Sequence, residues 1–110
     1  MVNMHSQTLI NAELKHAQSA QALGNEGQAR VCARRAAGIA ARDYLERHGE
    51  KVRTPSAYDL LKALAEDPSL SDDLRQIAMH LTMRVDEQFK LPADIDLIME
   101  AERLCGELMK

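Results

Sequence analysis

Two arginine–histidine pairs have the residue types and spacing that could move a proton beside a phosphate. Arg75 precedes His80 by five residues, and Arg42 precedes His48 by six. A histidine titrates near neutral pH and can accept or donate the proton of a ribose 2′-hydroxyl. An arginine can hold the phosphate and stabilise charge that develops on it. Five residues on a helix turn through about 140°, so Arg75 and His80 straddle one face rather than share it.

Other catalytic and metal-binding patterns are absent from the sequence. It contains no glycine-rich phosphate loop, GxSxG, HExxH or EF-hand pattern, and no CxxC or histidine-rich spacing typical of zinc sites. The acidic pairs Asp72-Asp73 and Asp94/Asp96 stand where helices are expected to begin, so capping and the helix dipole explain them. We therefore expect no metal and no cofactor.

A methionine strip accompanies the first arginine–histidine pair. Gln76, Met79 and Met83 fall on the outward face of the helix predicted to start after Ser71, and Arg75 and His80 flank them. Exposed methionine pairs often mark a contact surface, which makes these residues candidates for an interface. The alternative is that another helix of the same chain covers them.

The longest predicted element is one helix over residues 26–49. Asn25 and Gln28 form a capping-box pattern at its start, and Gly49 suits a left-handed turn after its end. Small residues repeat at three- and four-residue spacing along one stripe, which would let neighbouring helices approach closely. These residues are Ala29, Cys32, Ala33, Ala36 and Ala40.

The other face of this helix has two interpretations. Val31, Gly38 and Leu45 repeat every seven residues, and three arginines flank them: Arg34, Arg35 and Arg42. One interpretation is scattered apolar residues on a solvated basic face. The other is a self-association seam with arginine edges, whose basic strip binds a phosphate, an acidic partner or the acidic half of another copy. Residues 26–53 hold seven basic and four acidic residues, against six and twelve from residue 57 onward.

The remaining sequence predicts further helices and a single domain over residues 1–110. A first helix over residues 3–23 has a ragged apolar face that includes Leu9, Ile10 and Leu23. A short helix ends near Ala65, and a fourth has a core stripe of Leu74, Ile77, Ala78, Leu81, Val85 and Phe89. A fifth runs from about Ala93 to Leu108. The expected fold is an all-α, antiparallel four-helix up-and-down bundle with a short additional connecting helix.

Composition limits the function classes. The net charge of −3 provides no global basic field, so we expect no DNA binding. No apolar run approaches a membrane span, and the N-terminus lacks the pattern of a secretory leader. Cys32 and Cys105 lie on predicted apolar faces, which suits reduced, buried thiols in the cytoplasm.

The order of these helices resembles the HEPN superfamily. The alanine-rich run 35–41 is similar to the family's second helix, and Tyr44-Leu45, Gly49 and the run 58–61 (Tyr-Asp-Leu-Leu) follow in the family's order. The predicted closing helix is also similar, so the resemblance covers residues 9–108. The aromatic residue or glycine that commonly follows the family's histidine is absent, because Leu81-Thr82 stands there.

The resemblance implies an antiparallel bundle that forms a homodimer, with two lines of function. Many members are metal-independent ribonucleases with an Arg–His motif, which Arg75 and His80 match in spacing and place. Other branches are noncatalytic modules that bind nucleotides or assist a separately encoded nucleotidyltransferase. Our leading interpretation is such a noncatalytic binding module, with nucleotide or RNA as its ligand. The alternatives are the ribonuclease and a structural helical protein without a ligand.

Overall fold

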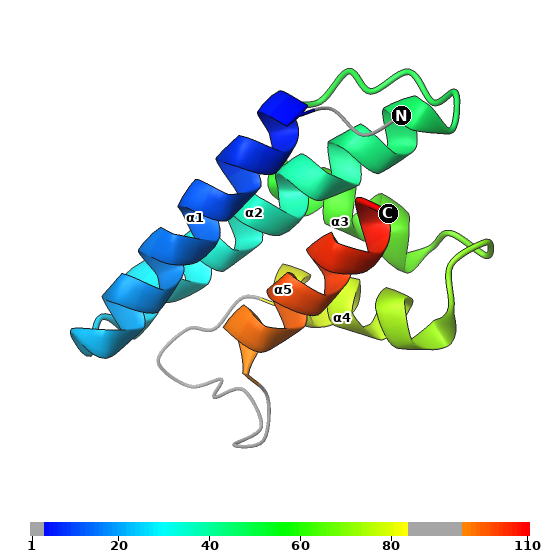
Figure 1. Ribbon diagram of the computed structural model, residues 1–110. Helices are drawn as coiled ribbons and strands as arrows, with labels where there is room; N and C mark the ends of the chain where they lie inside the picture. Colours follow the sequence, from blue (N-terminus) through cyan, green and yellow to red (C-terminus); the bar gives the residue numbers. More distant parts are fainter. Residues whose placement is uncertain (1–3, 84–95) are drawn as a thin grey trace.

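The computed structural model describes residues 4–83 and 96–110, which contain five α-helices and no strand. This confirms the all-α prediction. In Figure 1, α1 and α2 form a long antiparallel hairpin, and α3, α4 and α5 pack beside it. None of the described helices combines the length and apolar composition needed to cross a membrane. The helices are α1 (Met4–Ala22), α2 (Glu26–Arg47), α3 (Ala57–Ala65), α4 (Asp72–Thr82) and α5 (Leu97–Leu108).

The helix ends follow the predicted capping residues. The Asn25 side chain accepts a hydrogen bond from the Gln28 N–H at 3.1 Å, which confirms the cap, whereas the Gln28 side chain donates to Cys32 Sγ and does not complete the capping box. Ser56 and Ser71 cap α3 and α4 in the same way, because each hydroxyl accepts from a backbone N–H three residues later. Gly49 has a positive φ of 84°, so it turns the chain where predicted, although α2 itself ends at Arg47.

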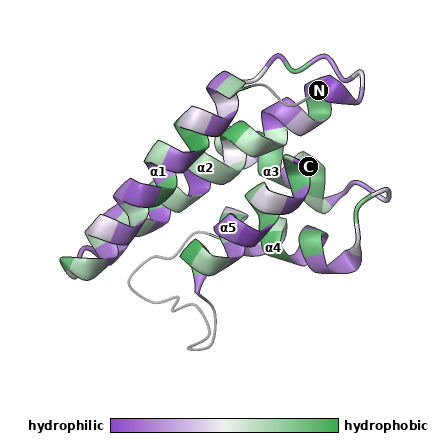
Figure 2. Ribbon diagram, in the orientation of Figure 1, coloured by the Kyte–Doolittle hydropathy of each residue, from purple (hydrophilic) through white to green (hydrophobic). Residues whose placement is uncertain are grey.

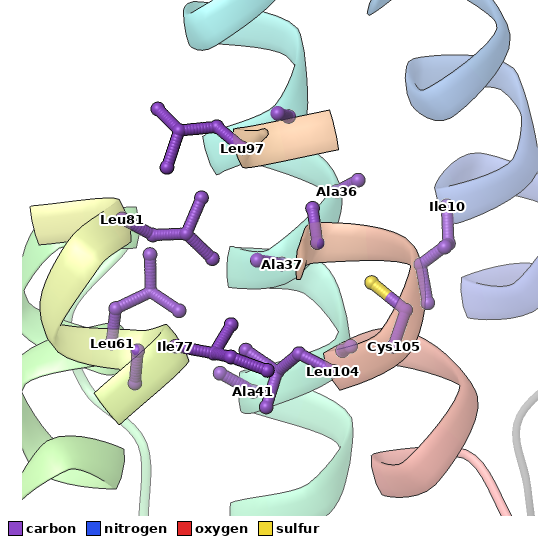
Figure 3. Packing of buried hydrophobic residues seen from close by; sticks show 14 of the residues in the cluster. Ile10, Ala36, Ala37, Ala41, Leu61, Ile77, Leu81, Leu97, Leu104 and Cys105 are labelled. Carbon is purple, nitrogen blue, oxygen red and sulfur yellow. The ribbon is translucent and has the colours of Figure 1, made fainter. Parts of the chain in front are cut away.

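The core is built around α2, which contacts each of the other four helices. Its predicted stripe of small residues is buried as expected, and Ala37 and Ala41 are buried as well. Figure 3 shows Ala36, Ala37 and Ala41 of α2 surrounded by larger side chains from the other helices, among them Leu61 and Leu104. Small side chains therefore line the central helix, and large ones fill the space around it.

The surroundings of Gly38 contradict the self-association seam that was predicted on the other side of α2. This glycine is buried, and a Cβ built on it would lie only 2.7 Å from the Cβ of Ala57 at the start of α3. Val31 is exposed, whereas Leu45 packs against the core. A continuous self-association seam through Val31, Gly38 and Leu45 is therefore wrong, because α3 of the same chain covers its middle.

The predicted core is confirmed in α5 and only in part in α1. Leu97, Ile98, Ala101, Leu104, Cys105 and Leu108 of α5 are all buried. In α1, Ile10 is buried but Leu9 is exposed, and Leu23 is exposed just after the end of the helix. Figure 2 shows hydrophilic and hydrophobic residues mixed along α1. α4 ends at Thr82 and buries Ile77, Ala78 and Leu81, whereas Leu74 is only partly buried. Val85, Phe89, Ala93 and Asp94 lie outside the described residues.

Candidate functional site

A cleft between α4 and α5 contains the predicted catalytic histidine. Its volume is about 300 Å³, and its polar lining includes Gln76 and His80 from α4 and Glu100 and Arg103 from α5. The Nδ1 atom of His80 lies 2.6 Å from Oε1 and 3.0 Å from Oε2 of Glu100. Both side chains are about four-fifths buried. The pair therefore links the two helices.

This contact determines how the imidazole is oriented. A carboxylate accepts hydrogen bonds, so Nδ1 of His80 carries the proton that it donates to Glu100. In the neutral ring, Nε2 is then the acceptor, an assignment that follows from the hydrogen-bond partner. A histidine held in this way can take up a proton from a group that enters the cleft.

Arg75 does not join His80 in this cleft. Its guanidinium pairs with Asp72 one turn earlier on α4, and its Nε is buried without a hydrogen-bond partner. It also lies close enough to Asp67 to act on that carboxylate. The pKa of Asp67 is below its usual value because Ser69 donates two hydrogen bonds to it, with smaller contributions from the charges of His48 and Arg75. The protomer therefore keeps the predicted Arg75–His80 pair apart.

Arg103 is the arginine that shares the cleft with His80, and the motif search did not find it. It forms an ion pair with Asp73 across the α4–α5 boundary, and both residues line the cleft. The motif search considered arginines on the same helix as the histidine, whereas Arg103 comes from α5. The signal in the sequence is that Glu100 and Arg103 are three residues apart, which places them one turn apart on the same side of a helix.

Three exposed methionines belong to α4, to its C-terminal cap and to α5, the two helices that form the cleft. The exposed fractions are 55% for Met79, 39% for Met83 and 67% for Met99. Gln76 and Met79 share one side of α4, as predicted, whereas Met83 is the residue that caps the end of this helix and has an extended backbone. Met99 belongs to α5 and lines the cleft, and the sequence analysis did not single it out. We call Gln76, Met79, Met83 and Met99, with the cleft between them, the methionine face.

The three predicted ligand-binding arginines of α2 have different surroundings. Arg34 reaches the end of α4, where its Nε donates to the Leu81 carbonyl at 2.7 Å and its Nη2 to the Met83 carbonyl at 3.3 Å. Arg35 and Arg42 line a second cleft, formed by α1, α2 and the start of α3. Arg34 is therefore a structural anchor, and the other two share a site.

Comparisons with protein families, with curated proteins and with solved structures found no match to this chain. The resemblance to the HEPN superfamily therefore stays a prediction. Within residues 4–83 and 96–110, no group of three or more histidine, cysteine or acidic side chains is placed to hold a metal ion. The two cysteines, Cys32 and Cys105, are buried thiols, as predicted.

Proposed function

We propose that the protein is a noncatalytic, HEPN-like binding module that forms a homodimer through its methionine face. In this proposal the helices have the antiparallel four-helix up-and-down arrangement of that superfamily, with α3 as the connecting helix. The observation that carries it is the exposure of Met79, Met83 and Met99 on the two helices that form one cleft, which Met99 lines. Flexible thioether side chains gathered at a surface are typical of interfaces.

The charges of this face favour a second copy of the chain as its partner. Asp73 and Arg103 lie side by side on the face, one acidic and one basic. A two-fold axis brings the same surface of two copies together, so each copy can offer its Arg103 to the partner's Asp73. A face of one sign would repel itself, whereas this one is complementary to itself.

The surroundings of Arg75 and His80 favour binding over catalysis. Each of the two side chains is engaged by a different carboxylate, Arg75 by Asp72 and His80 by Glu100. A phosphate held by Arg75 would therefore not be presented to the His80 imidazole within one protomer. The ribonuclease alternative therefore has to use Arg103, the arginine that lines the cleft with His80.

The test of self-association is the mass of the wild-type protein in solution, measured by light scattering across concentration. We expect a dimer for the wild type and a monomer for Met79→Glu, because the charge would be buried at the seam. Leu23→Glu is the matched control, since Leu23 is 86% exposed and belongs to the turn between α1 and α2 rather than to α4 or α5. A monomeric wild type, or a Met79→Glu dimer, would exclude this seam.

Charge reversal sharpens the same experiment. Asp73→Arg alone and Arg103→Asp alone should each weaken the dimer, because each places like charges opposite each other across the two-fold axis. The double reversal restores opposite charges and should restore the dimer. Failure of the double variant to recover would mean that these two residues do not face each other between copies.

A metal-independent ribonuclease is the second candidate, and the oriented His80–Glu100 pair is the observation that favours it. Cleavage of single-stranded RNA in the presence of a chelator would reveal it. A catalytic His80 predicts loss of cleavage in His80→Ala and retention in Arg75→Ala. Equal cleavage by wild type and His80→Ala would clear this histidine of a catalytic role.

Three further features of the proposal rest mainly on the HEPN resemblance. They are a separately encoded nucleotidyltransferase as partner protein, nucleotide or RNA as ligand, and a cytoplasmic location. The two buried thiols support the location, because reduced cysteines are typical of the cytosol. Complex formation with a nucleotidyltransferase encoded beside this protein, measured by co-purification of the two chains, tests the partner.

A further inference from the structure

A second cleft, lined by α1, α2 and the start of α3, contains basic, acidic and aliphatic side chains. Its volume is about 470 Å³, which is within the range of small-molecule sites. Arg35 and Arg42 enter it from α2, and Glu13 enters it from α1. The apolar lining is mainly aliphatic and includes Leu9, Ile39 and Leu60. None of its elements carries the methionine face.

The charged side chains in this cleft form few hydrogen bonds or ion pairs with the rest of the described chain. The Oε2 atom of Glu13 is buried and accepts no hydrogen bond. Among the described residues Glu13 forms no ion pair with either arginine, and Arg35 forms no hydrogen bond or ion pair. Arg42 uses one nitrogen, Nη2, to donate to the Thr54 carbonyl. Buried polar atoms in native proteins normally have a partner, so the cleft lacks a hydrogen-bond donor at Glu13. Arg35 is exposed, and its guanidinium is available to an acceptor that enters the cleft.

The unpaired Glu13 oxygen and the two arginines specify which chemical groups a ligand of this cleft must carry. A guanidinium recognises an oxyanion with two parallel hydrogen bonds, which suits a carboxylate or a phosphate at Arg35 and Arg42. A carboxylate oxygen accepts a hydrogen bond, so Glu13 requires an amine or a hydroxyl. The aliphatic walls suit a branched hydrocarbon body. Among the described residues no Phe, Tyr or Trp lines the cleft, and the imidazole of His5 is the one aromatic ring there on which a nucleobase could stack.

We infer that this cleft binds a small aliphatic oxyanion that also carries an amine or hydroxyl donor, the chemistry of a branched-chain amino acid or of its 2-hydroxy acid. Arg35 and Arg42 bind the carboxylate, Glu13 accepts from the donor, and the hydrocarbon lies against Leu9, Ile39 and Leu60. The inference goes beyond self-association. A ligand titration and a measurement of mass report on the two proposals separately.

¹H–¹⁵N NMR titration of the wild-type protein with four probes tests the inference. The first probe is L-leucine, and each of the other three differs from it by one chemical group. L-leucine and 2-hydroxy-4-methylpentanoate carry both the carboxylate and a donor. 4-Methylpentanoate lacks the donor, and leucinamide lacks the carboxylate. We expect the first two to shift the amides that line the cleft, 4-methylpentanoate to bind about tenfold more weakly, and leucinamide not to bind.

Variants assign the two halves of the site. Arg35→Ala should weaken leucine binding by about tenfold or more, because it removes one of the two guanidinium groups that bind the leucine carboxylate. Arg35 is exposed, so its replacement should not disturb the fold. Glu13→Ala should make leucine and 4-methylpentanoate bind equally. Lys62→Ala, exposed on α3 outside the cleft, is the control and should bind as the wild type does. If Glu13→Ala does not fold, Glu13→Gln replaces it and should weaken leucine relative to the 2-hydroxy acid.

Several outcomes would overturn the inference. Amide shifts by none of the probes would exclude the site. Equal binding of leucine and 4-methylpentanoate to the wild type would remove Glu13 from recognition. Tighter binding of inorganic phosphate or adenosine 5′-monophosphate than of leucine would replace the aliphatic ligand with a phosphate or a nucleotide.

Discussion

Gly38 is the position where one added methyl group tests the packing of α2 most directly. A Cβ at this residue would lie 2.7 Å from the Cβ and 3.1 Å from the Cα of Ala57. The first distance is well below van der Waals contact between carbon atoms, and the second involves backbone. Ala57 has no flexible side chain that can turn away. Gly38→Ala therefore requires that α3 shifts away from α2.

Two opposing effects determine how much Gly38→Ala changes the free energy of unfolding. Replacing glycine by alanine in a helix interior favours folding by about 1 kcal/mol. Overpacking a well-packed contact costs about 1–3 kcal/mol. Gly106 supplies the matched control, because it lies in α5 and a Cβ there would meet nothing within 4 Å. We expect Gly106→Ala to gain up to about 1 kcal/mol, and Gly38→Ala to be less stable than Gly106→Ala by about 1–3 kcal/mol.

Urea and thermal denaturation of the two variants would measure this difference. For a domain of this size, 1 kcal/mol corresponds to a change in Tm of about 4–8 °C. Adding Ala57→Gly to Gly38→Ala should recover more stability than the single changes predict together, because it removes the clashing Cβ. Equal gains in stability from Gly38→Ala and Gly106→Ala would refute the close contact between α2 and α3, and would return Gly38 to an open face.

Three other predictions follow from buried or charged groups. Arg47→Ala should lower the free energy of unfolding in urea by about 3 kcal/mol, because it leaves the buried Asp43 carboxylate without its ion pair, whereas the exposed Arg53→Ala should have little effect. Burial raises the pKa of Cys105 to about 12, so its thiol should resist iodoacetamide at pH 8 until the protein is unfolded, as mass spectrometry would show. The Ser69 hydrogen bonds lower the pKa of Asp67, so this group stabilises the fold above its unfolded pKa of about 4 and loses that contribution as pH falls through its lower folded pKa. The stability difference between wild type and Asp67→Asn should therefore be below about 1 kcal/mol at pH 7, since the Ser69–Asp67 hydrogen bonds are exposed to solvent, and should vanish in acid.

Local patterns predicted the helix ends well, because a cap depends on a few neighbouring residues. Asn25, Ser56 and Ser71 each satisfy a backbone N–H three residues away, and no distant part of the chain is needed. The alanine stripe of α2 was predictable for a similar reason, since helical spacing alone places its residues on one side.

Tertiary placement explains what the sequence pattern missed. Gly38 repeats with Val31 and Leu45 on what looks like an open face, and only the position of α3 shows that it is covered. Leu23 continues the apolar spacing of α1 but stands after the last helical residue, so it leaves the core. Arg103 reaches the His80 cleft from another helix, and no spacing within α4 encodes that approach.

The separation of Arg75 from His80 determines what a homodimer can do chemically. A two-fold axis through the methionine face would bring two His80–Glu100 pairs together, each already oriented across the α4–α5 boundary. It would leave both Arg75 side chains beside Asp72 and Asp67, outside the shared groove. The guanidinium available in that groove belongs to Arg103, which must leave Asp73 before it can hold a phosphate. Such a groove would contain His80 as a base and Arg103 as a cation that becomes available once it leaves Asp73. Any catalysis there should therefore depend on His80 and Arg103 and should not change when Arg75 is replaced.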